Sequence, residues 1–127
     1  MPRLAKLFLA IGAIAMLWAV ALGAFGAHAL KAQIAPELIA VYHTGVEYHF
    51  YHALGLLAVG LVAQRLPDSN WLRAAGWLML AGIVIFSGSL YLLALTGIRA
   101  FGAVTPVGGV AFMVAWVMFA VAVVKSR

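Results

Sequence analysis

The sequence predicts an all-α fold, an integral membrane four-helix bundle with short loops, and three observations support this prediction. Of the 127 residues, 67% are hydrophobic and only 9% are charged, whereas soluble domains carry roughly a quarter of charged residues. Four long runs are almost free of charge, and backbone polar groups in lipid must bond within their own segment. Six of the eight Lys and Arg residues lie in the two tails and the second loop, which would all be on the same side of the membrane. The runs should therefore be helices that cross a bilayer.

The predicted spans cover residues 7–28, 37–64, 73–96 and 105–125, within a single domain of residues 1–127. Each has about 20 residues or more, enough to cross a hydrocarbon core at about 1.5 Å per residue. Pro36 and Glu37 fit the first turn of the second helix, because proline and acidic side chains favour helix N-termini. Pro106 is expected to open the fourth helix in the same way.

The first span also resembles a secretory signal peptide. Arg3 and Lys6 precede its apolar stretch, and the triplet Ala27-His28-Ala29 follows. The stretch from residue 7 to residue 27 has 21 residues, however, which is longer than the roughly 7–15 residues of a signal core. We therefore expect this segment to be retained as a membrane helix.

The basic residues predict the orientation of the chain. Six lie in the tails and the second loop, whereas only Lys31 and Arg99 lie in the other two loops. Because Lys and Arg are retained on the cytoplasmic side, both termini should be cytoplasmic, in a bacterial inner membrane or an organellar membrane. The net charge of +5 is scattered, so no nucleic-acid partner is predicted. The expected partners are the lipid bilayer and either further copies of the chain or a larger membrane complex.

Small residues predict where helices approach one another closely. A ridge with a spacing of four residues runs along the first span, and a glycine pair opens the fourth. Such small-xxx-small patterns let helix backbones pack tightly in lipid. The alternative is that Gly and Ala are simply common in membrane helices. The predicted packing residues are Ala15, Ala19, Gly23, Ala27, Gly108 and Gly109.

Polar side chains of all four spans gather at one depth. Counted at about 1.5 Å per residue from the inner end of each helix, they lie in the outer third of the membrane. Ionisable groups that face lipid at this depth are costly, so they should face the bundle or each other. The candidate cluster consists of His28, Glu47, His49, His52, Ser87, Ser89, Tyr91 and Thr105.

Helical spacing separates the members of this cluster on the second span. His52 is the deepest of them, and we expect it to point inward with Tyr48 nearby. Glu47 lies about 140° around the helix from His52, so one inward face cannot hold both. Glu47 is expected to pair instead with His43, four residues earlier, near the interface.

The remaining polar residues have structural interpretations. Tyr42 and Tyr91 fit an outer interfacial belt of aromatic side chains. Hydroxyl groups in membrane helices often bond the backbone of their own helix, and this is expected of Ser87, Ser89 and Thr105.

No cofactor or metal is predicted. A haem held by two histidines is disfavoured because His28 and His52 differ in depth by about 13 Å. His28, at a helix end, is interpreted as an interfacial residue or cap, and His52 as a hydrogen-bonded tie between helices. The absence of cysteine excludes thiolate metal ligands and cysteine nucleophiles. No catalytic sequence motif is present, so no catalytic residue is predicted.

The sequence therefore favours a non-enzymatic integral membrane protein, structural or accessory, with a polar cluster in the outer leaflet. The alternative is a binding or transport module. Its outward-facing His, Glu, Ser and Tyr side chains would form a pocket for a small polar ligand, a lipid headgroup, a proton or a metal ion. An intramembrane enzyme is the least favoured class, because no nucleophile, base and metal can be assembled.

Four ordered segments carry a resemblance to a known family. They are Gly23–Leu30, Tyr51–Leu57, Phe86–Tyr91 leading on to Leu95–Gly97, and Thr105–Gly109. With these segments the chain resembles the family called domain of unknown function 423, which includes the animal transmembrane protein 256. The resemblance implies a small four-helix membrane protein, bacterial or organellar, and brings no established activity or cofactor. The residues shared with the family include His28, His52, Ser87, Ser89, Tyr91 and Thr105.

Overall fold

A computed structural model describes residues 1–127 and contains helices but no strands. The helices form four rods that are long and apolar enough to cross a membrane, which confirms the predicted all-α membrane bundle. The first rod joins α1 to the π-helix η1, and the third joins α3, the π-helix η2 and α4. The bounds are α1 Arg3–Phe25, η1 Gly26–Leu30, α2 Pro36–Ala63, α3 Asn70–Gly82, η2 Ile83–Ser87, α4 Gly88–Thr96 and α5 Ala100–Val124.

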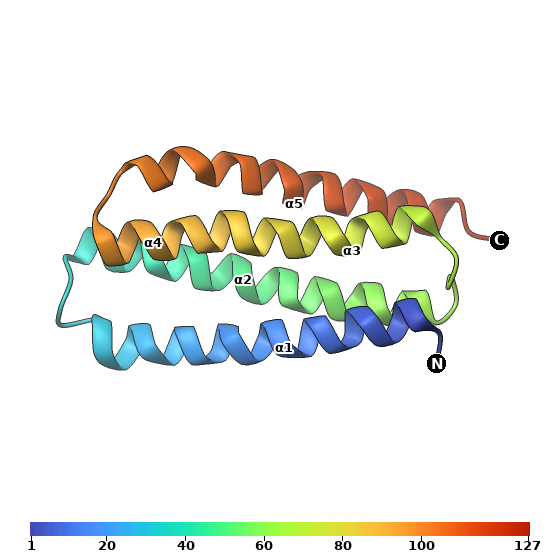
Figure 1. Cartoon of the computed structure of the whole chain (residues 1–127), viewed down its shortest axis with the longest axis horizontal. Helices are drawn as coiled ribbons and strands as arrows, with labels where there is room; N and C mark the ends of the chain where they lie inside the picture. The colour runs from blue at the N-terminus through green and yellow to red at the C-terminus, as the bar shows by residue number, and fades with distance from the viewer.

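The rods run antiparallel, with both termini at the same end (Figure 1). They follow one another in space as in sequence: α1 packs mainly on α2, and α5 packs mainly on α3, η2 and α4. The contacts of α2 with α3, η2 and α4 join these two pairs. We call the half of the bundle that holds the termini the proximal half, and the opposite half the distal half.

Local sequence signals mark several helix ends. Pro36 occupies the first turn of α2, as predicted. The Ser69 hydroxyl caps α3 by accepting the Leu72 N–H at 3.1 Å. Gly97 ends α4 in the left-handed conformation, with a φ of 71°, which a residue without Cβ adopts at no steric cost.

The predicted start of the fourth helix is wrong. The helix α5 begins at Ala100 instead of residue 105, and Pro106 lies inside it. A proline at this position removes the hydrogen bond to the carbonyl four residues earlier, and its ring crowds that carbonyl. Membrane helices tolerate such prolines because the freed backbone group finds another partner.

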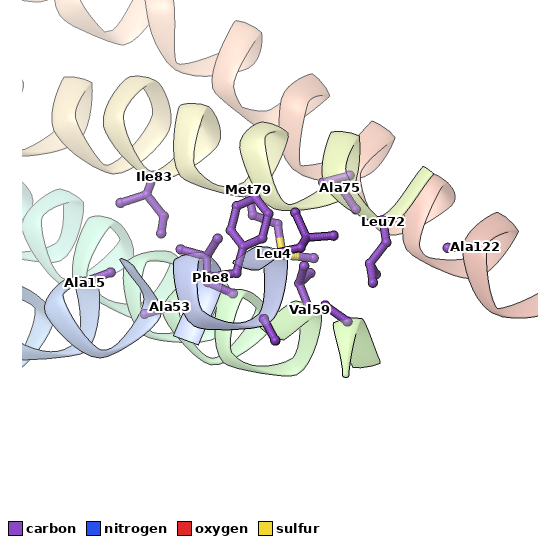
Figure 2. Close-up of a cluster of buried hydrophobic side chains, with 14 of the residues drawn as sticks. Leu4, Phe8, Ala15, Ala53, Val59, Leu72, Ala75, Met79, Ile83 and Ala122 are labelled. Atoms are coloured by element: carbon purple, nitrogen blue, oxygen red, sulfur yellow. The ribbon is translucent and has the colours of Figure 1, made fainter. Parts of the chain in front are cut away.

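The main apolar core fills the proximal half and the middle of the bundle (Figure 2). Its largest fully buried side chains are Phe8 of α1, Leu56 of α2, and Leu72 and Met79 of α3. Phe8 also meets Trp77 edge-on, with ring centroids 5.4 Å apart. The buried polar side chains lie in the middle of the bundle and in its distal half.

The predicted ridge on the first span is a packing face over only part of its length. Ala15 and Ala19 are buried and Gly23 is half-buried, but Ala27 is exposed. Residues four apart advance about 40° around the helix at each step, so Ala27 lies about 120° from Ala15. Gly26 comes 18 residues, or five turns of 3.6 residues, after the buried Phe8 and takes the inward position instead. Its α-carbon lies against the ring of Tyr42.

Further glycines mark close backbone approaches, and one is Gly60 of α2, where a Cβ would lie 2.8 Å from the Leu9 backbone nitrogen of α1. A Cβ at Gly12, which the predicted ridge omitted, would lie 2.9 Å from the Leu57 backbone nitrogen. Of the predicted pair, Gly108 is buried against the Phe86 backbone of η2. Gly109 is half-buried, and a Cβ there would come no closer than 3.8 Å to the Phe86 ring. Gly108 is thus the residue that lets α5 approach η2.

Candidate functional site

His52 bridges two helices near the middle of the bundle, closer to the proximal end of α2 than to its distal end, where the depth count placed it. Its Nδ1 lies 2.8 Å from the Tyr48 carbonyl oxygen, and its Nε2 accepts the Trp116 indole N–H at 3.0 Å. Because an indole nitrogen only donates, Nε2 must be the acceptor and Nδ1 must carry the hydrogen. The imidazole stacks on Phe112 of α5, with ring centroids 3.5 Å apart. His52 is therefore held as one neutral tautomer, inward and near Tyr48 as expected.

Ser87 ties η2 to α2. Its side chain is completely buried, and its hydroxyl donates to the Gly45 carbonyl at 2.7 Å. The expectation that Ser87 bonds its own helix is wrong. Gly45 explains the difference, because the missing side chain leaves space for Leu90 and Tyr91, which would lie 3.0–3.3 Å from a Cβ. The third rod consequently comes close enough to reach the α2 backbone.

Ser89 and Thr105 tie α4 to α5. Their hydroxyl oxygens lie 2.6 Å apart. Each is also near a carbonyl of its own helix, Ser89 2.8 Å from Phe86 and Thr105 3.5 Å from Phe101. The expected local bonds are thus present, and an interhelical bond accompanies them.

His49 joins α2 to α4 through Tyr91. The His49 Nδ1 and the Tyr91 hydroxyl oxygen lie 2.8 Å apart, and only 5% of His49 is exposed. The aromatic-belt interpretation of Tyr91 and Tyr42 is wrong, because Tyr91 is half-buried and Tyr42 is buried. Tyr42 donates its hydroxyl hydrogen to the Leu22 carbonyl of α1. The space beside Gly26 and Gly45 admits these two rings into the bundle.

His28 and Glu47 lie outside these buried contacts. Both side chains are exposed. In η1, Gly26 and Leu30 face inward, so His28 between them points outward. Glu47 and His43 line one surface depression of about 390 Å³ together with Phe50, without the ion pair that their spacing predicts. The structure therefore divides the predicted cluster into buried ties and two exposed side chains.

The buried ties are separate from one another and fully bonded. No buried side-chain nitrogen or oxygen lacks a hydrogen-bond partner. No group of three or more His, Asp or Glu side chains has the arrangement of a metal site. The ties link α2 to α5, α2 to η2, α4 to α5 and α2 to α4, so their common effect is to fix the helices against one another.

Sequence reasoning missed two members of this network, Trp116 and Tyr42. The role of Trp116 could have been predicted from its position, because it lies well inside its span and not at an interface. An indole N–H at that depth has no water to bind and needs an acceptor from another helix. Tyr42 carried no such signal, since its burial depends on Gly26 of another helix lying beside its ring.

Comparison with known proteins places this architecture in a family. The family described as "Protein of unknown function (DUF423)" matches residues 22–109. The UPF0382 membrane protein YwdK of Bacillus subtilis is 55% identical over 120 residues, which cover 94% of this chain and 98% of that protein. The UPF0382 membrane protein SSP2132 of Staphylococcus saprophyticus is 46% identical over 121 residues, covering 94% and 98%. No solved structure matches the chain.

The family match covers more than half of the chain, and the relatives are similar over nearly their whole length. Their names describe membrane proteins, in agreement with the four apolar rods. The resemblance seen in the sequence is confirmed: the chain is a membrane protein that belongs to the DUF423 family.

Proposed function

We propose that the protein is a non-enzymatic structural or accessory component of the bacterial plasma membrane, built to hold four helices in a fixed arrangement. The observation that carries this proposal is the bonding of His52. Both of its ring nitrogens are engaged, one by its own helix and one by Trp116 of α5. An imidazole committed in this way has no free nitrogen for proton transfer or metal binding.

The hydroxyl groups support the same proposal. Ser87 donates to a backbone carbonyl, and Ser89 bonds Thr105. A nucleophilic serine needs a base within hydrogen-bonding reach, and neither serine has a histidine as a partner. The alternative of an outward-open polar pocket is less well supported, because His28 and Glu47 do not join the buried ties.

The exposed apolar surface supports a role in contact with lipid or other membrane proteins. Large exposed hydrophobic side chains include Leu17 and Trp18 on α1, and Val110, Met113 and Val117 on α5. Since α1 and α5 are the outer helices of the row, each has a face that the chain itself does not cover. We infer that these faces meet lipid and either further copies of the chain or a larger membrane complex.

We further infer that both termini are cytoplasmic. The proximal half carries Arg65 and Arg73 beside the two tails, which contribute four more basic residues, whereas the distal loops carry only Lys31 and Arg99. This distribution follows the positive-inside rule. The distal half, with the ties made by Ser87, Ser89 and Tyr91, would then lie in the outer leaflet.

The proposal is tested by comparing His52→Leu with His43→Leu. His43 is exposed at the distal end of the same helix, so it is the matched control. We expect His52→Leu to lower the free energy of unfolding in detergent by about 1–2 kcal/mol, because Trp116 loses its acceptor. His43→Leu should leave that free energy nearly unchanged. Equal stability of the two variants would contradict the proposed role of His52.

A further inference from the structure

The exposed side of α2 carries Glu47 at a depth that lies inside the bilayer. The helix has 28 residues, or about 42 Å, so a hydrocarbon core of about 30 Å leaves about 6 Å outside at each end. Glu47 comes eleven residues after Pro36, which places it about 16 Å from the distal end of the helix. Its side chain is exposed, about 10 Å inside the hydrocarbon, where a carboxyl group is costly unless it has a partner.

The chain itself gives this carboxyl group no partner. His43 and Tyr51, one turn away on either side, line the same depression of about 390 Å³ without bonding to it. Acyl chains carry no hydrogen-bond donor, and the headgroups lie about 10 Å away, further than a glutamate side chain extends. A donor for Glu47 must therefore come from another protein chain in the membrane.

Glu47 belongs to a stripe that follows a heptad repeat along α2. Its members alternate three and four residues apart, and each is exposed or half-buried in the single chain. A mean spacing of 3.5 residues lets two helices wind around each other in a left-handed coiled coil. We call this stripe the α2 seam, and it consists of Thr44, Glu47, Tyr51, Leu54, Ala58 and Leu61.

A second copy of the chain has donors at the depth of Glu47. Two copies inserted with the same topology present parallel α2 helices, related by a two-fold axis along the membrane normal. In a parallel coiled coil, a side chain at the d position of Glu47 enters a hole in the facing helix. That hole includes Tyr48 and Tyr51 of the second copy, whose side chains are 38% and 51% exposed in the single chain. A phenolic O–H donates to a carboxyl oxygen, so the two faces are complementary.

We propose that two copies of this chain form a parallel dimer through the α2 seam, in which the Glu47 carboxyl group of each copy accepts hydrogen bonds from the Tyr48 and Tyr51 hydroxyls of the other. The seam is apolar from Leu54 to Leu61 and packs by side-chain contact alone, while the polar part fixes the register. The dimer deepens the proposed structural role, on which it rests, by naming a second copy as the partner.

Introduced cysteines can test the contact, because the chain has none of its own. Leu54→Cys places a thiol in the seam, and Val117→Cys places one on α5 as the control. The native side chains are 52% and 59% exposed, and both lie about 10–14 Å from the proximal ends of their helices. In membranes treated with an oxidant, we expect Leu54→Cys to form at least tenfold more disulfide-linked dimer than Val117→Cys.

A matched pair of substitutions tests the polar contact. Glu47→Met keeps the length of the side chain but leaves only a weak thioether acceptor, whereas Glu47→Gln keeps an oxygen that accepts hydrogen bonds. Because Glu47 is exposed in the single chain, neither change should disturb its fold. We expect Glu47→Met to raise the dimer dissociation constant at least tenfold, measured by analytical ultracentrifugation in detergent, and Glu47→Gln to leave it unchanged or lower.

Three results would overturn the proposal. Equal or greater linkage at position 117 would show that the α2 seam is not the contact between copies. A linked product of Leu54→Cys whose mass is not twice that of the chain would identify a different protein as the partner. An unchanged dissociation constant in Glu47→Met would exclude the polar contact. The comparison of His52→Leu with His43→Leu measures unfolding of the chain and not dimerisation, so the structural role and the dimer can fail separately.

Discussion

Trp116 of α5 donates its indole N–H to the Nε2 of His52 on α2 at 3.0 Å. The backbones of these two helices hardly approach each other, since α2 meets α3, η2 and α4 while α5 lies on the other side of that rod. The bond therefore spans a gap that the large side chains fill, including the Phe112 ring stacked on the imidazole. It fixes the distance and the rotation of α5 relative to α2, two helices that share few other contacts.

The Trp116 bond predicts coupling between two substitutions. Trp116→Phe keeps an aromatic ring but removes the donor, and it should lower the free energy of unfolding by about 1 kcal/mol. Combined with His52→Leu, it should cost less than the sum of the single changes, because both remove the same bond. Chemical unfolding in detergent measures all three variants. Trp18→Phe is the control, since Trp18 is exposed; strictly additive losses would disprove the coupling.

The buried Ser87 hydroxyl makes a second prediction. Ser87→Ala should lower the free energy of unfolding by about 0.5–1.5 kcal/mol, because the bond to the Gly45 carbonyl is lost. Ser126→Ala removes a similar bond at the exposed C-terminal end, and it should have no measurable effect. The comparison can be made by thermal unfolding in the same detergent. A larger loss from Ser126→Ala would show that burial does not govern the strength of these bonds.

The neighbouring glycines of α5 should respond differently to alanine. Gly108→Ala places a methyl group against the Phe86 backbone, which cannot rotate away. We expect it to lower the free energy of unfolding by about 1–3 kcal/mol. Gly109→Ala meets only ordinary contact with the Phe86 ring, and its higher helix propensity should make it neutral or stabilising by up to about 1 kcal/mol. Indistinguishable unfolding curves would contradict the close approach at Gly108.

The inferred orientation can be measured with introduced cysteines, because the chain has none of its own. Gln33 lies exposed in the loop between η1 and α2, and Ser126 lies exposed at the C-terminus. In intact bacteria, a membrane-impermeant maleimide should label Gln33→Cys. It should label Ser126→Cys only after the cells are permeabilised. The opposite pattern would place the termini outside and invert the assignment of the distal half.

Much of the fold was predictable from composition and spacing. Long apolar runs require helices in lipid whatever their partners, and this argument needs no tertiary information. The inward position of His52 followed from its depth and from the cost of exposing it. The start of α2 at Pro36 followed from the absence of a backbone N–H.

The missed features have different origins. The exposure of Ala27 and His28 follows from the ordinary helical period, because Gly26 lies five turns after the buried Phe8 and these two residues lie about 100° and 200° further around the helix. The interhelical bond of Ser87 depends on the close approach that Gly45 allows. The burial of Tyr42 and Tyr91 depends on glycines elsewhere in the chain, Gly26 and Gly45. One sequence does not show which glycine will face which ring.

The order of the four rods has a consequence for biogenesis. The most extensive contacts all join neighbours in the sequence: α1 with α2, α2 with the third rod, and the third rod with α5. Each rod can therefore pack on the preceding one as it leaves the translocon, with little loop entropy to overcome. The Trp116–His52 bond is among the contacts that can form only when the last rod, α5, arrives.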